Sequence, residues 1–401
     1  MKILQLTPQF IIPPDDGGRI GIYNITRELL ELGAEVTMVS LNTSQPEFQT
    51  ISISEKQLPV YSIHHSTKNS IARILYSVFD TEPLYLRKHY SKKILDKLLL
   101  LLKGKAFDII HADHTAMIPI ALELRKHLQL PVGVRMHNVE WKIWQRYAYE
   151  LPKTNPSHYY IQLQTNRLRK RETELLRMVD VAFPITEVDM NLCKDMAPLT
   201  RLELVAAGVD SKEWIKSDET QRNPYELVLA TPWSWKHNLT GALWFIEEVL
   251  PLIRKEVPEC TLTLLGKNAP SELYTMKDKG VDCLGYVDSV KPYYHRASLY
   301  IAPLFVGSGV RIKVLEAMAA GLPVVATPIA AEGINASDKE GLLRCNDAEV
   351  FASTILNLLH NQQRLVELGL AASTLMARQY QWKESIQHMY NTYLNLTKLK
   401  R

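Results

Sequence analysis

Residues 303–327 read PLFVGSGVRIKVLEAMAAGLPVVAT, and this stretch decides the fold of the second half of the chain. Its pattern is an apolar strand, a glycine turn, a helix, a second glycine turn and another apolar strand. In the first turn, Gly307 and Gly309 flank Ser308. Glycines at a strand-to-helix turn let backbone N–H groups approach a ligand at the helix N-terminus, so this turn favours an anion such as a diphosphate.

Three charged side chains follow the turn. Arg311 and Lys313 are cations near the start of the helix, and Glu316 lies in an otherwise apolar run. A carboxylate in apolar surroundings needs hydrogen-bond donors, and a ribose diol supplies two. Together the turn and these side chains predict a nucleotide-diphosphate site. The alternative is a plain loop and helix start, in which Arg311 and Glu316 form a surface ion pair.

Short apolar strands alternate with helical patterns along the whole chain. We expect strands at residues 2–6, 35–41, 108–111, 132–136, 181–184, 226–230, 261–265, 281–284, 299–302 and 323–326. This alternation predicts an α/β fold with mostly parallel sheets covered by helices on both faces. Two such halves indicate two Rossmann-like domains facing a cleft, with ligands at the carboxyl ends of the strands.

A chain of 401 residues is too long for one ordinary core, which favours two domains. The alternation stops in a polar stretch that we interpret as a linker. The expected organisation is an N-terminal domain over 1–207, a linker over 208–224, a C-terminal domain over 225–380 and a terminal helix over 381–401.

Composition excludes several classes of protein. No run of apolar residues is long enough to span a bilayer, and the first residues lack the features of a signal peptide, so we expect a cytoplasmic protein. Four scattered cysteines form neither a disulfide framework nor a zinc site. A net charge of +4 is too small to indicate a nucleic-acid partner.

The positive charge is concentrated in the first half of the chain. Residues 87–105 hold seven basic side chains against one acidic, together with the apolar run Leu98–Leu102. One interpretation is a core helix with a solvated basic face. The other is a surface that contacts an anionic membrane or a lipid-linked acceptor, at the inner face of the membrane. The basic cluster at 167–171 leaves the same two alternatives open.

The stretch 303–327 resembles the signature region of retaining glycosyltransferase family 4, in which a glutamate helix is followed by AMAxGxPVVAT. More closely it is similar to a subgroup whose loop reads GxGxRxKxLEAxAxGxPVV. Glu316 matches the second of the two glutamates of the family and Ser308 stands at the position of the first. The resemblance implies a GT-B fold in which Glu316 holds the ribose, while Arg311, Lys313 and the loop amides hold the phosphates.

Two motifs of the first half resemble the same family. Asp15 to Arg19 read DDGGR, similar to the family's N-terminal glycine loop, which implies that Gly17 and Gly18 approach the donor phosphates. His137 begins the sequence HNVE, similar to the subgroup's HNxE motif, which implies a catalytic histidine beside the donor sugar and the acceptor hydroxyl. A lone histidine is more often structural, and Glu140 is equally suited to capping the next helix.

Two further segments resemble the donor domain of the family. Trp235 and Asn238 match a Gly-x-x-x-W-x-x-N pattern in which Lys236 is the candidate clamp for the diphosphate. Asn238 alternatively caps the helix that follows. Tyr286 follows Gly285 in a segment similar to the one that contacts the nucleotide base, although the end of a core strand fits equally well.

The resemblance implies transfer of a hexose-like sugar from a UDP- or GDP-linked donor to a glycan or lipid-linked acceptor. It implies retention of the anomeric configuration and a role in polysaccharide or cell-envelope glycan synthesis. We expect no cofactor and no metal, because fixed cations and helix dipoles stabilise the leaving group. The alternatives are a nucleotide-sugar 2-epimerase of the same fold and a non-catalytic protein that binds nucleotide sugars.

Overall fold

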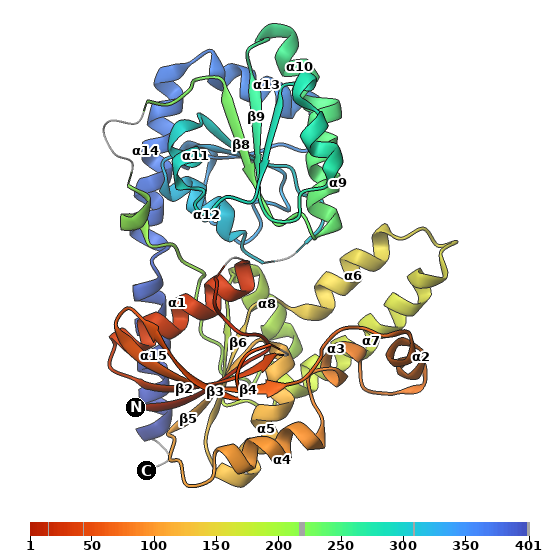
Figure 1. The fold of residues 1–401 in the computed structure, drawn as a ribbon, viewed down its shortest axis with the longest axis vertical. Coiled ribbons are helices and arrows are strands. Elements are labelled where there is room, and N and C mark those ends of the chain that lie inside the picture. Colours follow the sequence, from red (N-terminus) through yellow and green to blue (C-terminus); the bar gives the residue numbers. More distant parts are fainter. Residues whose placement is uncertain (15, 43, 216–220, 308, 399–401) are drawn as a thin grey trace. The chain divides into compact units, whose positions relative to one another are not determined.

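A computed structural model describes residues 1–14, 16–42, 44–215, 221–307 and 309–398. The chain divides into two compact units (Figure 1): the first comprises Met1–Ala206 with Trp382–Arg401, and the second comprises Ala207–Gln381. None of the helices in the described ranges is both long and apolar enough to cross a bilayer.

The first unit is built on a seven-stranded sheet in the order β3-β4-β2-β1-β5-β6-β7. Its strands are β1 (Lys2–Thr7), β2 (Glu35–Asn42), β3 (Phe48–Ile53), β4 (Lys56–His64), β5 (Ile109–Asp113), β6 (Val132–Met136) and β7 (Val181–Pro184). All neighbouring strands are parallel except β3 and β4, which form an antiparallel hairpin that the strand pattern did not predict.

Helices cover both faces of this sheet because its strands are apolar on both sides. The helices are α1 (Gly17–Glu31), α2 (Ile71–Phe79), α3 (Leu84–Arg87), α4 (Lys92–Leu101), η1 (Thr115–Met117), α5 (Ile118–Leu128), α6 (Glu140–Glu150), α7 (Pro156–Leu176), α8 (Glu187–Met196) and α15 (Trp382–Lys398). Leu4 and Leu6 share a core with α4 and α5. Gln5 points to the other face, where its side-chain oxygen accepts a hydrogen bond from Thr26 of α1 (2.9 Å).

The terminal helix α15 belongs to the first unit, where it packs beside α1. The Tyr393 hydroxyl lies 2.6 Å from Nδ1 of the buried His111 on β5. A side chain at Gly133 of β6 would overlap the Tyr393 ring, so the sheet has room for this tyrosine only because β6 carries a glycine there. Figure 1 also shows α2, α3, α6 and α7 extending away from the sheet on one side.

The second unit is built on a six-stranded parallel sheet in the order β10-β9-β8-β11-β12-β13. Its strands are β8 (Glu226–Ala230), β9 (Thr261–Leu265), β10 (Val281–Gly285), β11 (Leu299–Ala302), β12 (Val324–Ala326) and β13 (Leu342–Arg344). Its helices and helical turns are η2 (Ser211–Trp214), α9 (Lys236–Trp244), η3 (Phe245–Val249), α10 (Leu250–Glu256), η4 (Ser271–Thr275), η5 (Lys277–Lys279), α11 (Lys291–Arg296), α12 (Ile312–Ala319), η6 (Asp338–Glu340), α13 (Ala348–Leu359) and α14 (Gln362–Gln379).

The described parts of the expected linker are packed against the second unit. Trp214 is buried and stacks on Tyr294, with ring centroids 5.6 Å apart. Arg222 donates hydrogen bonds to four carbonyls, at the end of α11 and just after α12. Burial lowers the pKa of Arg222 to about 10. These contacts arise from tertiary structure and have no signature in the polar sequence of this stretch; residues 216–220 lie outside the described ranges.

Candidate functional site

In the second unit, the chain leaves the central strand β8 toward β9 and later returns to β11 on the other side. The loops after β8 and β11 therefore run in opposite directions from neighbouring strand ends. In open α/β sheets this topological switch point is where ligands bind. The segments 231–236, 303–307 and 309–311, which carry residues expected in the donor site, lie at this point.

The glycine-rich loop adopts backbone conformations that other residues rarely take. Gly307 has a φ of 141° and Gly309 has a φ of 77°. A Cβ atom at Gly307 would overlap the guanidinium group of Arg311, so the glycine lets this cation lie against the loop backbone. Arg311 is also the N-cap residue that precedes α12. Ser308, expected in the same site, lies outside the described residues.

Glu316 is buried on α12, and its carboxylate has a partner within the chain. Nζ of Lys313 donates to Oε2 of Glu316 (2.8 Å), and the side chains are 29% and 10% exposed respectively. Lys313 is thus the cation that pairs with Glu316, and the carboxylate of this pair is buried, unlike the surface pair of the alternative interpretation. Lys313 was expected at the phosphates. In the structure its ammonium group donates a hydrogen bond to Glu316.

The β8–α9 loop places its three candidate residues differently. Lys236 is the exposed first residue of α9. Trp235 is the N-cap residue that precedes α9, so the alternative of Asn238 as the helix cap is wrong. The Asn238 amide instead donates to the carbonyl of Pro232 (2.8 Å) and holds the loop. Trp233 is buried, and its backbone N–H donates to the carbonyl of Lys267 (3.1 Å).

Tyr286 follows β10 and is 59% exposed. Nζ of Lys267, just after β9, lies 4.7 Å from the centre of the Tyr286 ring, within the range of a cation–π interaction. Lys267 escaped the sequence analysis because it belongs to no recognised motif. Its position after a strand, next to Gly266, was the available signal.

The first unit has its own switch point, between β1 and β5. The loop after β1 leads to Gly17, where α1 begins, and Asp16 caps this helix by accepting the N–H of Arg19 (2.9 Å). A Cβ at Gly18 would lie 3.8 Å from Nε2 of His114, which follows β5. The glycine pair and His114 therefore lie side by side; Asp15 is outside the described residues.

His137 is held by a buried ion pair. Nη2 of Arg135 lies 2.8 Å from Nδ1 of His137, and Nη1 of Arg135 donates to Oδ1 of Asp113 (2.8 Å). Arg135 and Asp113 are almost completely buried. Burial alone would raise the pKa of Asp113, but the adjacent Arg135 and hydrogen bonds from His111 and His114 hold it well below its usual range.

The contact with Arg135 assigns the tautomer of His137. A guanidinium group can only donate, so Nδ1 must accept and the proton of the neutral ring lies on Nε2. Nδ1 of His114 lies 3.2 Å from Oδ1 of Asp113, within the distance of an ion pair. The two imidazole centroids are 4.7 Å apart. The donating Nε2 of His137 thus belongs to a ring that lies beside the His114 ring.

His114 has a φ of 79°, which is uncommon for a residue other than glycine and typical of functional positions. His114, Asp113 and Arg135 were missed as functional residues. The available signal was the sequence His111-Ala112-Asp113-His114 at the carboxyl end of a strand. Its importance depends on the strand order, which brings β5 and β6 together.

Glu140 is the first residue of α6, and the cap of this helix is formed by another residue. Glu172 of α7 accepts the backbone N–H groups of Glu140 and Trp141, both at 3.1 Å. Burial, together with the Glu140 carboxylate, raises the pKa of Glu172 to about 8, and burial also raises the pKa of Glu140. The two carboxyl groups thus form a buried support behind the loop that carries His137.

We expect Asp113→Asn to lower the free energy of unfolding by about 3–5 kcal/mol at neutral pH, because buried Arg135 loses its carboxylate partner. Because the pKa of Asp113 is lowered in the folded state, its ionised carboxylate contributes fully to the free energy of unfolding above about pH 4. This contribution is lost as the pH falls through the folded-state pKa. Urea denaturation at neutral and acid pH should therefore show the difference from wild type narrowing toward low pH. Asp195→Asn, at an exposed position of α8, is the control. Equal stability of Asp113→Asn and wild type would contradict the assignment.

Within the described ranges, no three His, Cys, Asp or Glu side chains gather as ligands for a metal ion. All four cysteines are free thiols. Cys193, Cys260 and Cys345 are buried. The independence from metal expected from the resemblance stays a proposal.

Comparison with protein families identifies two domains. Residues 16–213 match the family described as Glycosyltransferase Family 4, and residues 227–361 match the family described as Glycosyl transferases group 1. A curated relative is the "Uncharacterized 44.6 kDa protein in cps region" of Klebsiella pneumoniae, 28% identical over 163 residues. This alignment covers 38% of the present chain and 42% of the relative, less than half the length of either.

Solved structures share the fold over almost the whole chain. Sucrose-phosphate synthase from Thermosynechococcus elongatus matches with a TM-score of 0.72 and 16% identity, over 100% of both chains. Anabaena HepE in complex with UDP matches with a TM-score of 0.66 and 13% identity, over 98% of this chain and 100% of HepE. At such low identities these structural matches establish the fold alone. They confirm the predicted fold class of two Rossmann-like domains with mostly parallel sheets. The chain matches a Family 4 domain followed by a group 1 domain, and it has the two-domain fold of GT-B glycosyltransferases.

Proposed function

We propose that this chain transfers a sugar from a nucleotide-diphosphate sugar to a glycan or lipid-linked acceptor, with retention of configuration. The observation that carries the proposal is the switch point of the second unit, where the glycine-rich loop, Arg311 and the Lys313–Glu316 pair lie together. A UDP-linked donor is supported by the solved structures of HepE with UDP and with UDP-glucose, which share this fold.

In the proposed donor site, the Glu316 carboxylate accepts hydrogen bonds from both hydroxyls of the ribose, while Lys313 keeps this carboxylate oriented. Arg311 and the amides of the glycine loop contact the diphosphate. Tyr286, over which Lys267 lies, offers a ring for stacking against the base. Lys236 is a further candidate for the phosphates.

In the proposed reaction, the C1–O bond between sugar and diphosphate breaks, and the acceptor oxygen bonds to C1 on the same face. The departing phosphate oxygen takes the acceptor proton, so no separate general base is required. Fixed cations stabilise the charge that develops on the leaving group, without a metal or cofactor.

The Nε2–H group of His137 donates a hydrogen bond to a sugar hydroxyl, in keeping with the contact of its Nδ1 with Arg135. His114 is a candidate acceptor for another hydroxyl, and the Gly17–Gly18 loop beside it for contact with phosphate. The first unit would thus recognise the acceptor and the reacting sugar. Contact with the inner face of a membrane would then follow from a lipid-linked acceptor.

A screen of UDP- and GDP-sugars by thermal shift tests the donor, followed by product analysis with and without acceptor sugars. The correct donor at a hundredfold excess over its Kd should raise the Tm of the second unit by about 5 °C or more. Interconversion of the donor without acceptor would instead support a 2-epimerase. Binding without turnover under any condition would support a non-catalytic nucleotide-sugar protein.

A further inference from the structure

Helix α2 (Ile71–Phe79) turns its apolar side chains away from the protein. At 3.6 residues per turn, six of its nine residues fall in one arc of about 160°. All six are apolar or aromatic: Ile71, Ala72, Leu75, Tyr76, Val78 and Phe79. Ile71, Leu75, Tyr76 and Phe79 are 79%, 61%, 60% and 89% exposed. Surface helices normally turn this arc toward the core, so an outward apolar arc indicates an interaction surface.

The orientation of α2 is set by polar contacts on its opposite side. The hydroxyl groups of Ser77, the buried residue of the helix, and Tyr160 of α7 lie 2.8 Å apart. Arg167 of α7 donates to the carbonyls of Ser77 (2.6 Å) and Val78 (2.9 Å) at the C-terminal end of α2. The basic cluster at 167–171, whose role the sequence left open, therefore includes a structural contact to this helix. These bonds hold the apolar arc outward.

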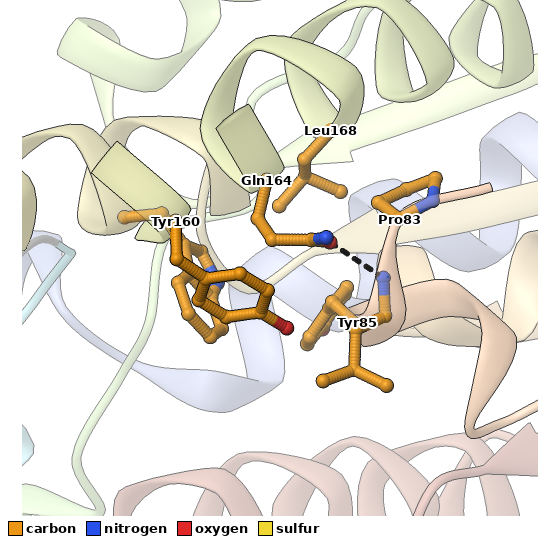
Figure 2. Close-up of a pocket in the computed structure, with 7 residues that line it drawn as sticks. Pro83, Tyr85, Tyr160, Gln164 and Leu168 are labelled. Carbon is orange, nitrogen blue, oxygen red and sulfur yellow. Dashed lines mark hydrogen bonds between the residues drawn. The ribbon is translucent and has the colours of Figure 1, made fainter. Parts of the chain in front are cut away.

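The segment after α2 is also anchored to α7. Figure 2 shows Gln164 of α7 reaching across a small cavity lined by Pro83, Tyr85, Tyr160 and Leu168. Its side-chain oxygen accepts the backbone N–H of Leu84 (2.9 Å). The cavity, of about 10 Å³, has room for about one water molecule and is not a ligand site.

A cation-lined groove of about 690 Å³ runs beside the apolar arc. Within the described residues its lining contains no carboxylate; it consists of His65, Ala72, Arg73, Tyr76, Ser77, Leu84, Arg87, Lys88, Tyr90, Ser91 and Lys92. Ala72 and Tyr76 belong to both the groove and the arc, so the two surfaces are continuous. Arg87 is partly neutralised by Asp80 (3.1 Å).

The basic segment 87–105 contributes to this surface through charge. Leu98 and Leu102 are buried in the core of the unit, so of the two interpretations of this run the core helix is confirmed. Arg87, Lys88 and Lys92 line the groove. The exposed apolar residues beside the groove come from α2, outside the segment 87–105.

We propose that the apolar arc of α2 and the adjacent cationic groove form one docking surface for an anionic phospholipid bilayer. An apolar helix face bordered by Lys and Arg is the arrangement that lies in the plane of a bilayer interface, with the cations at the phosphates. A second copy of this chain fits less well, because two such faces would bring like charges together. The inference rests on the proposed function for its purpose, access to a lipid-linked acceptor, whereas the binding itself requires no turnover.

Vesicle flotation tests the docking surface. The whole chain should float with vesicles that contain about one third phosphatidylglycerol, and far less with pure phosphatidylcholine. The triple variant Ile71→Ser, Leu75→Ser, Phe79→Ser should lose at least about a hundredfold in affinity for the anionic vesicles. The double variant Lys88→Gln, Lys92→Gln should lose about fivefold per cation, and added salt should weaken the wild type.

Matched controls come from the second unit. Val366 and Leu370 are equally exposed apolar residues of α14, and Lys277 and Lys279 are exposed lysines. Val366→Ser with Leu370→Ser, and Lys277→Gln with Lys279→Gln, should bind vesicles as the wild type does. Unchanged circular dichroism and nucleotide-sugar binding in the triple variant would show that its loss is local.

Two results would overturn the docking surface: failure of the wild type to float with anionic vesicles, or unchanged flotation of the triple variant. Sedimentation velocity tests whether a second copy of this chain binds to this surface instead of a bilayer. A wild-type dimer that the triple variant converts to a monomer, without vesicle binding by either, would make this face a contact between two copies. If the wild type floats with anionic vesicles but transfers no sugar from any donor, the proposed function is rejected and the docking surface stands.

Discussion

Glu316→Ala is expected to weaken UDP binding by about a hundredfold or more, because two hydrogen bonds to a charged acceptor are lost, each contributing about 1.5–3 kcal/mol. The value of kcat/KM for the donor should fall at least as far. Calorimetric titration with UDP and initial rates of transfer measure the two effects. The effect on folding should be smaller, because among the described residues the carboxylate of Glu316 bonds to Lys313 on the same helix.

Lys313→Met separates positioning from phosphate binding. If the lysine mainly orients Glu316, its loss should weaken the binding of UDP and of uridine by similar factors. If it contacts the phosphates, the affinity for UDP should fall much more than the affinity for uridine. Glu367→Gln, at an exposed position of α14, is the matched control and should bind UDP as the wild type does. Unchanged UDP affinity in Glu316→Ala would place the ribose elsewhere.

His137→Ala should lower kcat by about a hundredfold with little effect on the affinity for UDP, because removal of a preorganised donor typically costs a factor of 10²–10³. The decisive variant is His137→Gln. Its amide oxygen can accept from Arg135 while its NH₂ group donates, as Nδ1 and Nε2 of the assigned tautomer do. We therefore expect His137→Gln to retain activity within about tenfold of the wild type.

His137→Glu distinguishes a donor from a base. A glutamate can accept from Arg135 and can take a proton, but its carboxylate cannot donate. More activity in His137→Glu than in His137→Gln would make the residue a general base and reject the donor role. His360→Ala, at an exposed position after α13, controls for the general effect of replacing a histidine.

Most strands of the two sheets could be predicted closely because buried parallel strands are short apolar runs between glycine and polar turns, but β13 (Leu342–Arg344) was missed. Residues 132–136, 181–184, 226–230, 261–265 and 299–302 form strands with the expected bounds. The β3–β4 hairpin escaped because its first strand is largely exposed and lacks a continuous apolar run. The packed linker escaped because its anchors, Trp214 and Arg222, contact residues distant in sequence.

The candidate site was predictable where its residues are close in sequence. Gly307, Arg311 and Glu316 lie within a stretch of ten residues, so local geometry brings them together at the start of α12. The identity of the partner of Glu316 was not predictable, because Arg311 and Lys313 are both near and only their side-chain directions distinguish them. The close-packed glycine loop turns Arg311 back against Gly307 and leaves Lys313 to bond Glu316.

By itself the sequence determined the two α/β halves and the glycine turn before α12, since periodicity and turn chemistry are local properties. Only the tertiary structure decided which polar side chains meet. Asp113 and Arg135 lie on β5 and β6, and their pairing beside His137 depends on the order of strands in the sheet. Only the tertiary structure, too, decided that α2 faces outward. A helical period reveals an apolar face, whereas the contacts of Ser77 and Val78 with α7 decide which way that face points.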